Sequence, residues 1–533
     1  MVASSQPLAT AAGLEILFRG GNAADAAVAT AAALNVTEPA STGLGGDMFA
    51  LFFDVRTGKI SALNGSGRAP SALTLEKLRN TEGAFQDDTL LPYHALTVTV
   101  PGACAGWCDL IERHGTKSLA AIFTPAIQLA EQGFPVAPIT SHFWQRGADR
   151  QLKTSLNGVE MTMNGRAPNP GEVFKNPSLA RTLKTIARSG KAAFYEGKIA
   201  QAVASTVQQA GGCLTVADLA AHVSTWDEPI STSYGGLSIW ECPPNGQGIT
   251  ALLALNILEG YNLPSDPIAA DRLHLEIEAL RLAFIDTGWY VTDPRHRKTS
   301  RRIKLSEVYP VLVSKEYAAV RRKLIDPQKA TLDQKRGVPI SSSDTVYFCV
   351  VDKWGNACSF INSNYMGFGT GIVPHGWGFT LQNRGHNFSL DPDHPNVLAP
   401  GKRPYHTIIP AMITRQSDGS LFGPMGVMGG FMQPQGHLQV FLALAQGIDP
   451  QTALDMPRFC IEDGLAGGRV ALEYGIPGET IDALKDRGHP VRLVSGWERA
   501  EFGRGQVILR DPATGVLTGG SDPRADGCAM ALI

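Results

Sequence analysis

The sequence predicts an α/β (α+β) protein that folds as one unit. Helical patterns dominate up to about residue 300, and strand and hairpin patterns follow Thr345. The length of 533 residues exceeds that of an average domain, but an α/β fold can bury one large core. Hydrophobic residues make up 44% of the chain and charged residues 18%, which is typical of a globular protein. We therefore expect helices and sheets around a shared core.

Local signals define the first two helices. Apolar periodicity predicts a helix over residues 7–19, ended by the glycine pair that follows. Asn22 is a good N-cap for a second helix over residues 23–34, in which Asp25 stands at the third position. This helix is rich in alanine and has no wide polar face, so it should pack against neighbours on several sides.

The other expected elements follow from periodicity and turn residues. The chain is mainly helical over residues 119–210. Further patterns predict three hairpins and two amphipathic helices: hairpins at residues 49–63, 414–422 and 507–518, and helices at residues 250–258 and 271–284. Residues 327–343 are polar and end in three serines, so they form the best candidate linker.

Composition argues against two classes of partner. The formal net charge is −2 and no basic run occurs, which disfavours nucleic acid. No window approaches the ~18 consecutive apolar residues of a membrane span. The first residues form neither a basic nor an apolar signal region, so we expect a cytoplasmic protein.

The eight cysteines show no metal or disulfide pattern. They lack a second close pair or a histidine cluster at zinc spacing, so we expect reduced, mostly buried thiols and neither metal nor cofactor. Cys349 and Cys358 stand on the two arms of a predicted hairpin and can face each other. His274 and Glu276 lie on one predicted helix, where we expect a structural role.

A threonine at a strand entrance is the strongest candidate for chemistry. Residues 346–351 form an almost unbroken β-branched and aromatic run, which predicts a buried strand, and residues 357–363 return as its partner. Thr345 stands directly before this strand and directly after the polar linker. Because such polar residues commonly flank strands, the local sequence alone favours an ordinary linker that enters a sheet.

Cleavage before Thr345 would change its chemistry. A hydroxyl is a weak nucleophile without an adjacent base. A free α-amine, with a reference pKa of ~7.7–8.0, supplies that base near neutral pH. In the uncut chain, the Thr345 hydroxyl can attack the Asp344 carbonyl and convert the peptide bond to an ester that water opens.

Several longer segments place this threonine in a family context. They are residues 2–29, 42–54, 97–107, 124–136, 275–286 and 341–389, the triplet at 402–404 and the glycine pair at 429–430. In this order, and over nearly all of the chain, they resemble the γ-glutamyltranspeptidase family of N-terminal-nucleophile hydrolases. The resemblance implies a four-layer αββα sandwich with mostly antiparallel sheets. It also implies that the unit 1–533 processes itself into a large subunit, 1–344, and a small subunit, 345–533, which stay associated.

The resemblance implies catalytic roles for four residues. Thr345 matches the nucleophile, and Ser363 matches a family threonine that hydrogen-bonds the nucleophile's amine. Gly429 and Gly430 match the pair whose backbone N–H groups form the oxyanion hole, where glycine permits close approach to the developing charge. Without the family context, these glycines would indicate only a tight turn after a strand.

The positions that match substrate-binding residues depart from the family pattern. Ser66 replaces the carboxylate-binding arginine, and Arg68 follows two positions later. The remaining matches are Asn387 for an aspartate that holds the α-amino group, Arg384 for a glutamine, Tyr365 for an asparagine, and His406 and Thr407 for two serines. Loss of the aspartate and gain of an arginine and an imidazolium predict a pocket that is more positive by about two to three charges. A cationic α-amine would lose a charge-assisted hydrogen bond worth ~1.5–3 kcal/mol.

Three functions remain open at this stage. The first is cleavage of γ-glutamyl or related amide bonds through an acyl-enzyme, as glutathione hydrolases do, with a small molecule rather than nucleic acid or membrane as partner. The second is an amidohydrolase or acylase for an acid without a free α-amino group, such as an oxamate or glutaryl amide. The third is a catalytically idle relative, but the joint presence of four catalytic groups favours an enzyme.

Overall fold

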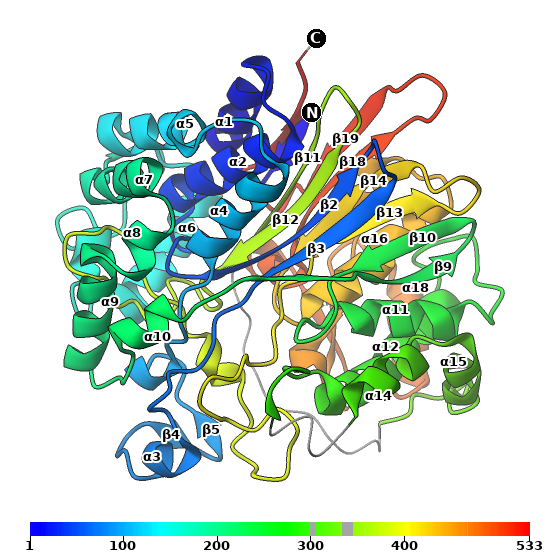
Figure 1. Ribbon diagram of the computed structural model, residues 1–533. Helices are drawn as coiled ribbons and strands as arrows, with labels where there is room; N and C mark the ends of the chain where they lie inside the picture. Colours follow the sequence, from blue (N-terminus) through cyan, green and yellow to red (C-terminus); the bar gives the residue numbers. More distant parts are fainter. Residues whose placement is uncertain (298–303, 333–344, 466, 533) are drawn as a thin grey trace.

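Two large antiparallel sheets pack face to face at the centre of the molecule (Figure 1). The computed structural model describes residues 1–297, 304–332, 345–465 and 467–532. Among these residues, the first sheet has seven strands, in the order β20 (Cys528–Met530), β1 (Val2–Ser4), β11 (Val346–Val351), β12 (Ala357–Ser363), β2 (Asp47–Asp54), β3 (Lys59–Gly65) and β8 (Thr225–Asp227). The second has six, in the order β19 (Leu517–Ser521), β18 (Arg504–Arg510), β14 (Leu421–Met428), β13 (Ala411–Arg415), β10 (Leu237–Glu241) and β9 (Ile230–Tyr234).

Helices cover the outer face of each sheet, as Figure 1 shows. The first sheet is covered by α1 (Pro7–Phe18), α2 (Ala23–Thr37), α4 (Ala103–His114), α5 (Leu119–Gln132) and α7 (Pro177–Ser189). The second is covered by α11 (Gly248–Leu258), α12 (Ala270–Tyr290) and α16 (Met432–Ala445). The predicted four-layer αββα sandwich is therefore confirmed.

Smaller elements complete the described chain. The further helices are α3 (Leu75–Arg79), α6 (Pro138–Gly147), α8 (Ala192–Tyr195), α9 (Lys198–Gln209), α10 (Val216–Ala220), α14 (Leu305–Leu312), α15 (Lys315–Arg322), α17 (Pro450–Asp455) and α18 (Gly478–Asp486). The further strands are β4 (Phe85–Gln86), β5 (Thr89–Leu90), β6 (Phe134–Pro135), β7 (Val173–Phe174), β15 (Phe459–Ile461), β16 (Val470–Glu473) and β17 (Val491–Val494). None of the described helices combines the length and apolar character needed to cross a lipid bilayer.

Strand β11 is apolar on both faces because both faces are covered. Tyr347 and Cys349 point into the core between the two sheets, whereas Phe348 and Val350 point into the core beneath the outer helices. A strand buried on both sides needs an unbroken apolar sequence, which explains the run that follows Thr345. The predicted hairpins β2–β3, β11–β12, β13–β14 and β18–β19 all form.

Two structural predictions were wrong. Cys349 pairs with Ser359, and Cys358 pairs with Val350, so the two thiols point to opposite faces of the sheet. Helices α11 and α12 are not amphipathic: every residue of α11 is buried, and so is α12 from Arg272 to Phe284. They lie inside the helical layer, where polar side chains find internal partners.

The histidine on α12 has the structural role that we expected. His274 Nδ1 lies 2.8 Å from His489 Nε2, and His274 Nε2 lies 2.8 Å from the Asp326 carbonyl. Glu276 is paired with Arg272 at 2.7 Å. No cluster of metal-ligating side chains occurs among the residues that the structure describes.

The cap of α2 also anchors a distant loop. Asp25 is fully buried and accepts the Asn22 N–H at 2.9 Å, which closes the predicted capping box. The same carboxylate accepts bonds from the Thr116 N–H, the Thr116 hydroxyl and the Lys117 N–H, at 2.9, 2.6 and 3.1 Å. One side chain therefore fixes both the start of α2 and the loop before α5.

We expect Asp25→Ala to destabilise the protein by ~2–4 kcal/mol, because it leaves several buried donors without a partner. Thermal unfolding followed by circular dichroism should show a lower Tm. The control is Asp482→Ala, which removes an exposed carboxylate paired with Lys485 at 3.1 Å and should change stability by ~0.5 kcal/mol or less. Equal Tm values for the two variants would contradict this role of Asp25.

Candidate active site

Thr345 lies at the entrance of a strand inside the first sheet. Because Val346 pairs with Asn362, Thr345 comes to stand beside Ser363 at the end of β12. The Thr345 hydroxyl donates a hydrogen bond to Ser363 Oγ at 3.0 Å, and both residues are buried. The structure thus brings together the two hydroxyls matched to the nucleophile and its partner. The other predicted cleavage-site residue, Asp344, lies outside the described residues.

The glycine pair forms a turn at the end of β14. Gly429 and Gly430 have φ angles of +135° and +58°, a region that favours glycine. The Gly430 carbonyl accepts bonds from Gln247 Nε2 at 2.8 Å and from the Gln433 N–H at 3.3 Å. Among the hydrogen bonds of the described residues, neither glycine's N–H is a donor. Neither N–H is therefore occupied by an acceptor in the described part of the chain, and their role as an oxyanion hole stays a prediction.

Arg384 is a buried cation beside this pair of hydroxyls. Its Nη2 lies 3.4 Å from Ser363 Oγ, and its Nη1 donates to Thr407 Oγ1 at 2.7 Å. The guanidinium carbon lies 4.2 Å from the centre of the Tyr365 ring, a cation–π contact. Burial lowers the pKa of Arg384 to about 10, with the charge of Asp47 opposing that shift, so the side chain stays cationic at neutral pH.

Asn387 is already engaged by a neighbouring tyrosine. The Tyr365 hydroxyl donates to Asn387 Oδ1 at 2.6 Å, and Asn387 Nδ2 donates to the Tyr405 carbonyl at 3.1 Å. Tyr365 adopts φ = +81°, which is unusual for a residue with a side chain. The strained backbone holds its ring between Arg384 and Asn387.

His406 does not carry the positive charge that we expected. Its Nε2 donates to Asp47 at 3.0 Å, and its Nδ1 accepts the Ile408 N–H at 3.4 Å, so both ring nitrogens are used within the protein. Burial lowers the pKa of His406 to about 3, and nearby Arg384 adds to that shift. The imidazole is therefore neutral, and the predicted imidazolium was wrong because the ring is fully buried and lies near the charge of Arg384.

Arg68 lies in a different environment from the other predicted substrate-binding residues. It is half-buried on the loop after β3, and its Nη1 donates to the Val223 carbonyl at 3.3 Å. Arg403 donates to the same carbonyl at 3.2 Å. Burial lowers the pKa of Arg68, while Asp293 opposes the shift. The described contacts place Arg68 with these groups and not with Thr345 or Arg384.

Sequence reasoning missed two residues that organise the site. Gln247 donates to the Thr407 carbonyl at 2.7 Å and to the Gly430 carbonyl at 2.8 Å, which joins the arginine site to the glycine turn. Asp47 accepts bonds from His406 and from Gln382 Nε2 at 3.0 Å. Both residues act through contacts that are distant in sequence, and only Asp47 lies in a segment that the family resemblance covers.

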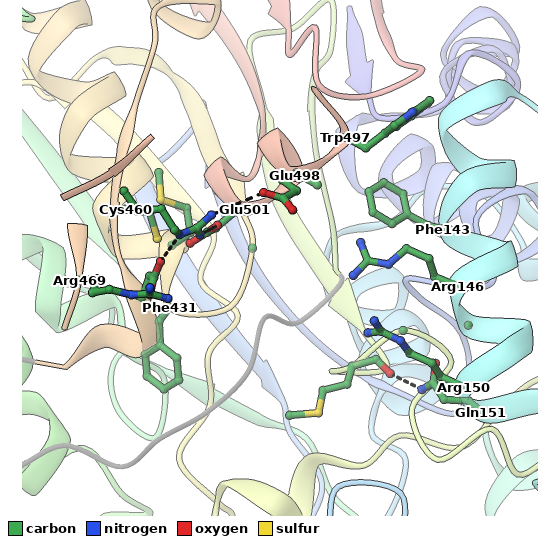
Figure 2. Close-up of a pocket in the computed structure, with 18 of the residues that line it drawn as sticks. Phe143, Arg146, Arg150, Gln151, Phe431, Cys460, Arg469, Trp497, Glu498 and Glu501 are labelled. Carbon is green, nitrogen blue, oxygen red and sulfur yellow. Dashed lines mark hydrogen bonds and ion pairs between the residues drawn. The ribbon is translucent and has the colours of Figure 1, made fainter. Parts of the chain in front are cut away.

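A cavity of about 430 Å³ opens next to the glycine turn (Figure 2). Gly429, Met366 and Gly367 are among the residues that line it. Its walls carry four aromatic residues, four arginines and three glutamates: Tyr93, Phe143, Phe431, Trp497, Arg146, Arg150, Arg469, Arg492, Glu462, Glu498 and Glu501. No sequence pattern predicted this cavity, because its walls come from segments far apart in the chain.

Comparison with known proteins agrees with this geometry. Residues 9–532 match the family described as Gamma-glutamyltranspeptidase. The chain belongs to the γ-glutamyltranspeptidase family. It is an enzyme of this family, and the family resemblance proposed from the sequence is confirmed.

Three similar proteins cover 99% or more of this chain. The Glutathione hydrolase-like YwrD proenzyme of Bacillus subtilis is 36% identical, over 100% of this chain and 98% of the relative. The Oxamate amidohydrolase proenzyme of Klebsiella pneumoniae is 32% identical, over 99% and 98%. The crystal structure of cephalosporin acylase from Bacillus halodurans is 46% identical, covers 100% and 95%, and superposes with a TM-score of 0.90.

The neutral state of His406 in this γ-glutamyltranspeptidase-family protein predicts a pH dependence of stability. Because the pKa falls from 6.5 to about 3 on folding, the unfolded chain binds one more proton between these values. Stability should therefore fall as the pH falls below 6.5, by up to ~1.4 kcal/mol per pH unit from this residue. We expect His406→Gln, which retains an N–H donor toward Asp47, to show a shallower fall in Tm between about pH 7 and pH 5.

The control for this prediction is His375→Gln, since the His375 side chain is 84% exposed. This variant should retain the slope of the wild-type protein. If His406→Gln had the same slope as the control, His406 would not be a buried neutral imidazole.

Proposed function

We propose that this chain is a self-processing amide hydrolase whose acyl donor carries a carboxylate and needs no free α-amine. The unit 1–533 would cleave itself between Asp344 and Thr345 and release the Thr345 α-amine. The term proenzyme in the names of two full-length relatives supports the processing step. The contact between the Thr345 and Ser363 hydroxyls supports the assignment of the nucleophile.

The charge of Arg384 supports a carboxylate in the acyl group. The side chain is fully buried, and its hydrogen-bond partners are the neutral hydroxyls of Thr407 and Ser363. Its Nε has no hydrogen-bond partner within the described part of the chain. A buried cation without a directly bonded anion is costly, and a guanidinium matches a carboxylate in shape and charge. An anionic substrate group at Arg384 would remove that cost.

The charge and hydrogen bonds of Asn387 support a donor that needs no α-amine. A carboxamide lacks the charge that would balance an ammonium group. Its oxygen, the atom that would accept from an amine, already accepts the Tyr365 hydroxyl at 2.6 Å. An amine-bearing donor would have to displace that bond or remain unpaired, and both alternatives disfavour it.

The proposed reaction uses residues whose positions have been described. The Thr345 α-amine takes the proton of the Thr345 hydroxyl, and the oxygen attacks the amide carbonyl. The N–H groups of Gly429 and Gly430 stabilise the resulting oxyanion. The leaving amine departs with a proton, and the acyl group remains as an ester on Thr345. Water or a second amine then attacks the ester and regenerates the enzyme.

A γ-glutamyl donor is the second candidate. The family assignment favours it, as does the name of the Bacillus subtilis relative. Arg384 and Thr407 would then hold the α-carboxylate, with the α-amine oriented away from Asn387.

The proposal also includes a cytoplasmic location, which the eight free cysteines support, and a small amide as the substrate.

Replacement of Thr345 tests the processing step. We expect wild-type protein to give two bands on a denaturing gel, for residues 1–344 and 345–533, which elute together on gel filtration. Thr345→Ala should remain one intact chain with no amidase activity, because the attacking oxygen is absent. The control is Thr331→Ala, a threonine outside the site. An intact wild-type chain, or a Thr345→Ala chain cut at the same bond, would refute self-cleavage by Thr345.

A donor comparison tests the acyl specificity. We expect kcat/KM for a glutaryl anilide to equal or exceed that for the matching γ-glutamyl anilide. Asn387→Asp restores a carboxylate and should shift preference toward the γ-glutamyl donor, by about tenfold for each ~1.4 kcal/mol regained. A wild-type preference for the γ-glutamyl donor by orders of magnitude would favour the second candidate. The exposed-site control is Asn80→Asp, which should leave the preference unchanged.

A further inference from the structure

The cavity in Figure 2 shares Gly429 with the proposed reaction centre but does not include the buried arginine site. Gly429 of the proposed oxyanion hole lines the cavity, together with Met366, which directly follows Tyr365. Arg384 and Asn387 are buried and do not line the cavity. If the acyl group binds at Arg384, the other half of the amide must extend into the open cavity.

Two arginines in this cavity lack an acidic partner. Arg146, near the end of α6, and Arg150, on the π-helical turn Ala148–Leu152, are exposed and extend toward the centre of the cavity in Figure 2. Neither side chain forms an ion pair or hydrogen bond with another residue in the part of the chain that the structure describes. The intervening carboxylate, Asp149, is instead paired with Lys153 at 2.6 Å.

The other two arginines of the cavity are neutralised. Arg469 lies 2.9 Å from Glu462, and Arg492 lies 2.6 Å from the same carboxylate. Arg492 also contacts Glu498 at 3.6 Å and Glu501 at 2.5 Å. The three glutamates thus gather on one wall, and the uncompensated positive charge lies on the opposite wall with Arg146 and Arg150. Like charges four residues apart on a helix repel each other, so a bound anion would relieve this repulsion.

An aromatic surface borders the same wall. Trp497 is 56% exposed, which is a large fraction for tryptophan, and it stacks on His142 with ring centres 4.2 Å apart and planes 12° apart. His142 belongs to α6, whereas Trp497 comes from the turn Gly496–Phe502. Phe143, also on α6, lies near Trp497 in Figure 2, and its ring centre is 5.5 Å from that of His142. The stacking fixes Trp497 at the cavity, where its free face can cover a planar group.

We propose that this cavity binds the leaving-amine half of the substrate, and that this half is a ring-bearing amine with its own carboxylate or similar anion. Arg146 and Arg150 would hold the anion, and Trp497 with Phe143 would cover the ring. The assignment rests on the proposed amide hydrolysis at Thr345. With the acyl group at Arg384, the leaving amine is assigned to the cavity that Gly429 lines. The same site would receive an anionic amine as an acceptor when the ester on Thr345 is attacked.

Two substrates that differ only in this anion test the proposal. Glutaryl-4-aminobenzoate and glutaryl-4-aminobenzamide have nearly the same size and ring, but only the first carries a charge on the leaving amine. We expect wild-type kcat/KM to be greater for the aminobenzoate by about tenfold or more. In the double variant Arg146→Gln/Arg150→Gln this ratio should fall to near one, whereas Arg188→Gln, an exposed arginine on α7, should retain the wild-type ratio. A wild-type ratio near one, or a ratio unchanged in the double variant, would overturn the proposal.

Direct binding separates this proposal from the proposed reaction. Titration calorimetry with 4-aminobenzoate, and with 4-aminobenzamide as the neutral probe, should show selective binding of the anion by wild type and its loss in the double variant. If neither amide is hydrolysed but the anion still binds in an arginine-dependent way, the proposed hydrolysis fails and the anion site stands. If 4-aminobenzoate binds no better than 4-aminobenzamide, the anion site fails. Processing and Tm of each variant show that it is folded.

Discussion

The buried carboxylate of Asp47 holds together the segments that form the candidate active site. It is fully buried at the start of β2, directly opposite Ser363 in the sheet register. Besides His406 and Gln382, it accepts the backbone N–H groups of Gly67 and Gly102, at 2.9 and 3.1 Å. Burial alone would raise the pKa of Asp47, but the bonds from His406 and Gln382 and the charge of Arg384 bring it below its ordinary value.

Loops that are remote in sequence therefore converge on one anion. A buried carboxylate that loses its donors costs several kcal/mol, so these loops cannot move independently. Arg384 lies two residues after Gln382, and Thr407 directly follows His406. The contacts of Asp47 thus hold the segments that carry Arg384 and Thr407, and Ser363, which accepts the Thr345 hydroxyl, is the register partner of Asp47.

The sequence could predict features that depend on neighbouring residues. The capping box of α2 needs only Asn22 and Asp25, and the hairpins need only their strands and turns. The protonation of His406 depends on Asp47, 359 residues away, and on the loss of water around the ring. Likewise, the apolar pattern of α11 indicates one buried face, but only the packed structure shows that its other faces are covered as well. The candidate catalytic groups were accessible to sequence reasoning because the family resemblance covers their segments, whereas the cavity was not.

The strand order of the two sheets bears on when the proposed cleavage could happen. In the first sheet, β1 lies between β11 and β20, and β12 lies between β11 and β2, so strands from before and after Thr345 interleave. In the second sheet, β10, which precedes Thr345 in the chain, pairs with β13, which follows it. A newly made chain that was cut before these pairings formed would have to assemble its central sheet from two diffusing pieces, each with exposed strand edges that favour aggregation. If the chain is cut before Thr345 as proposed, this topology requires the intact chain to fold first, so that the sheet closes while the two segments are still joined.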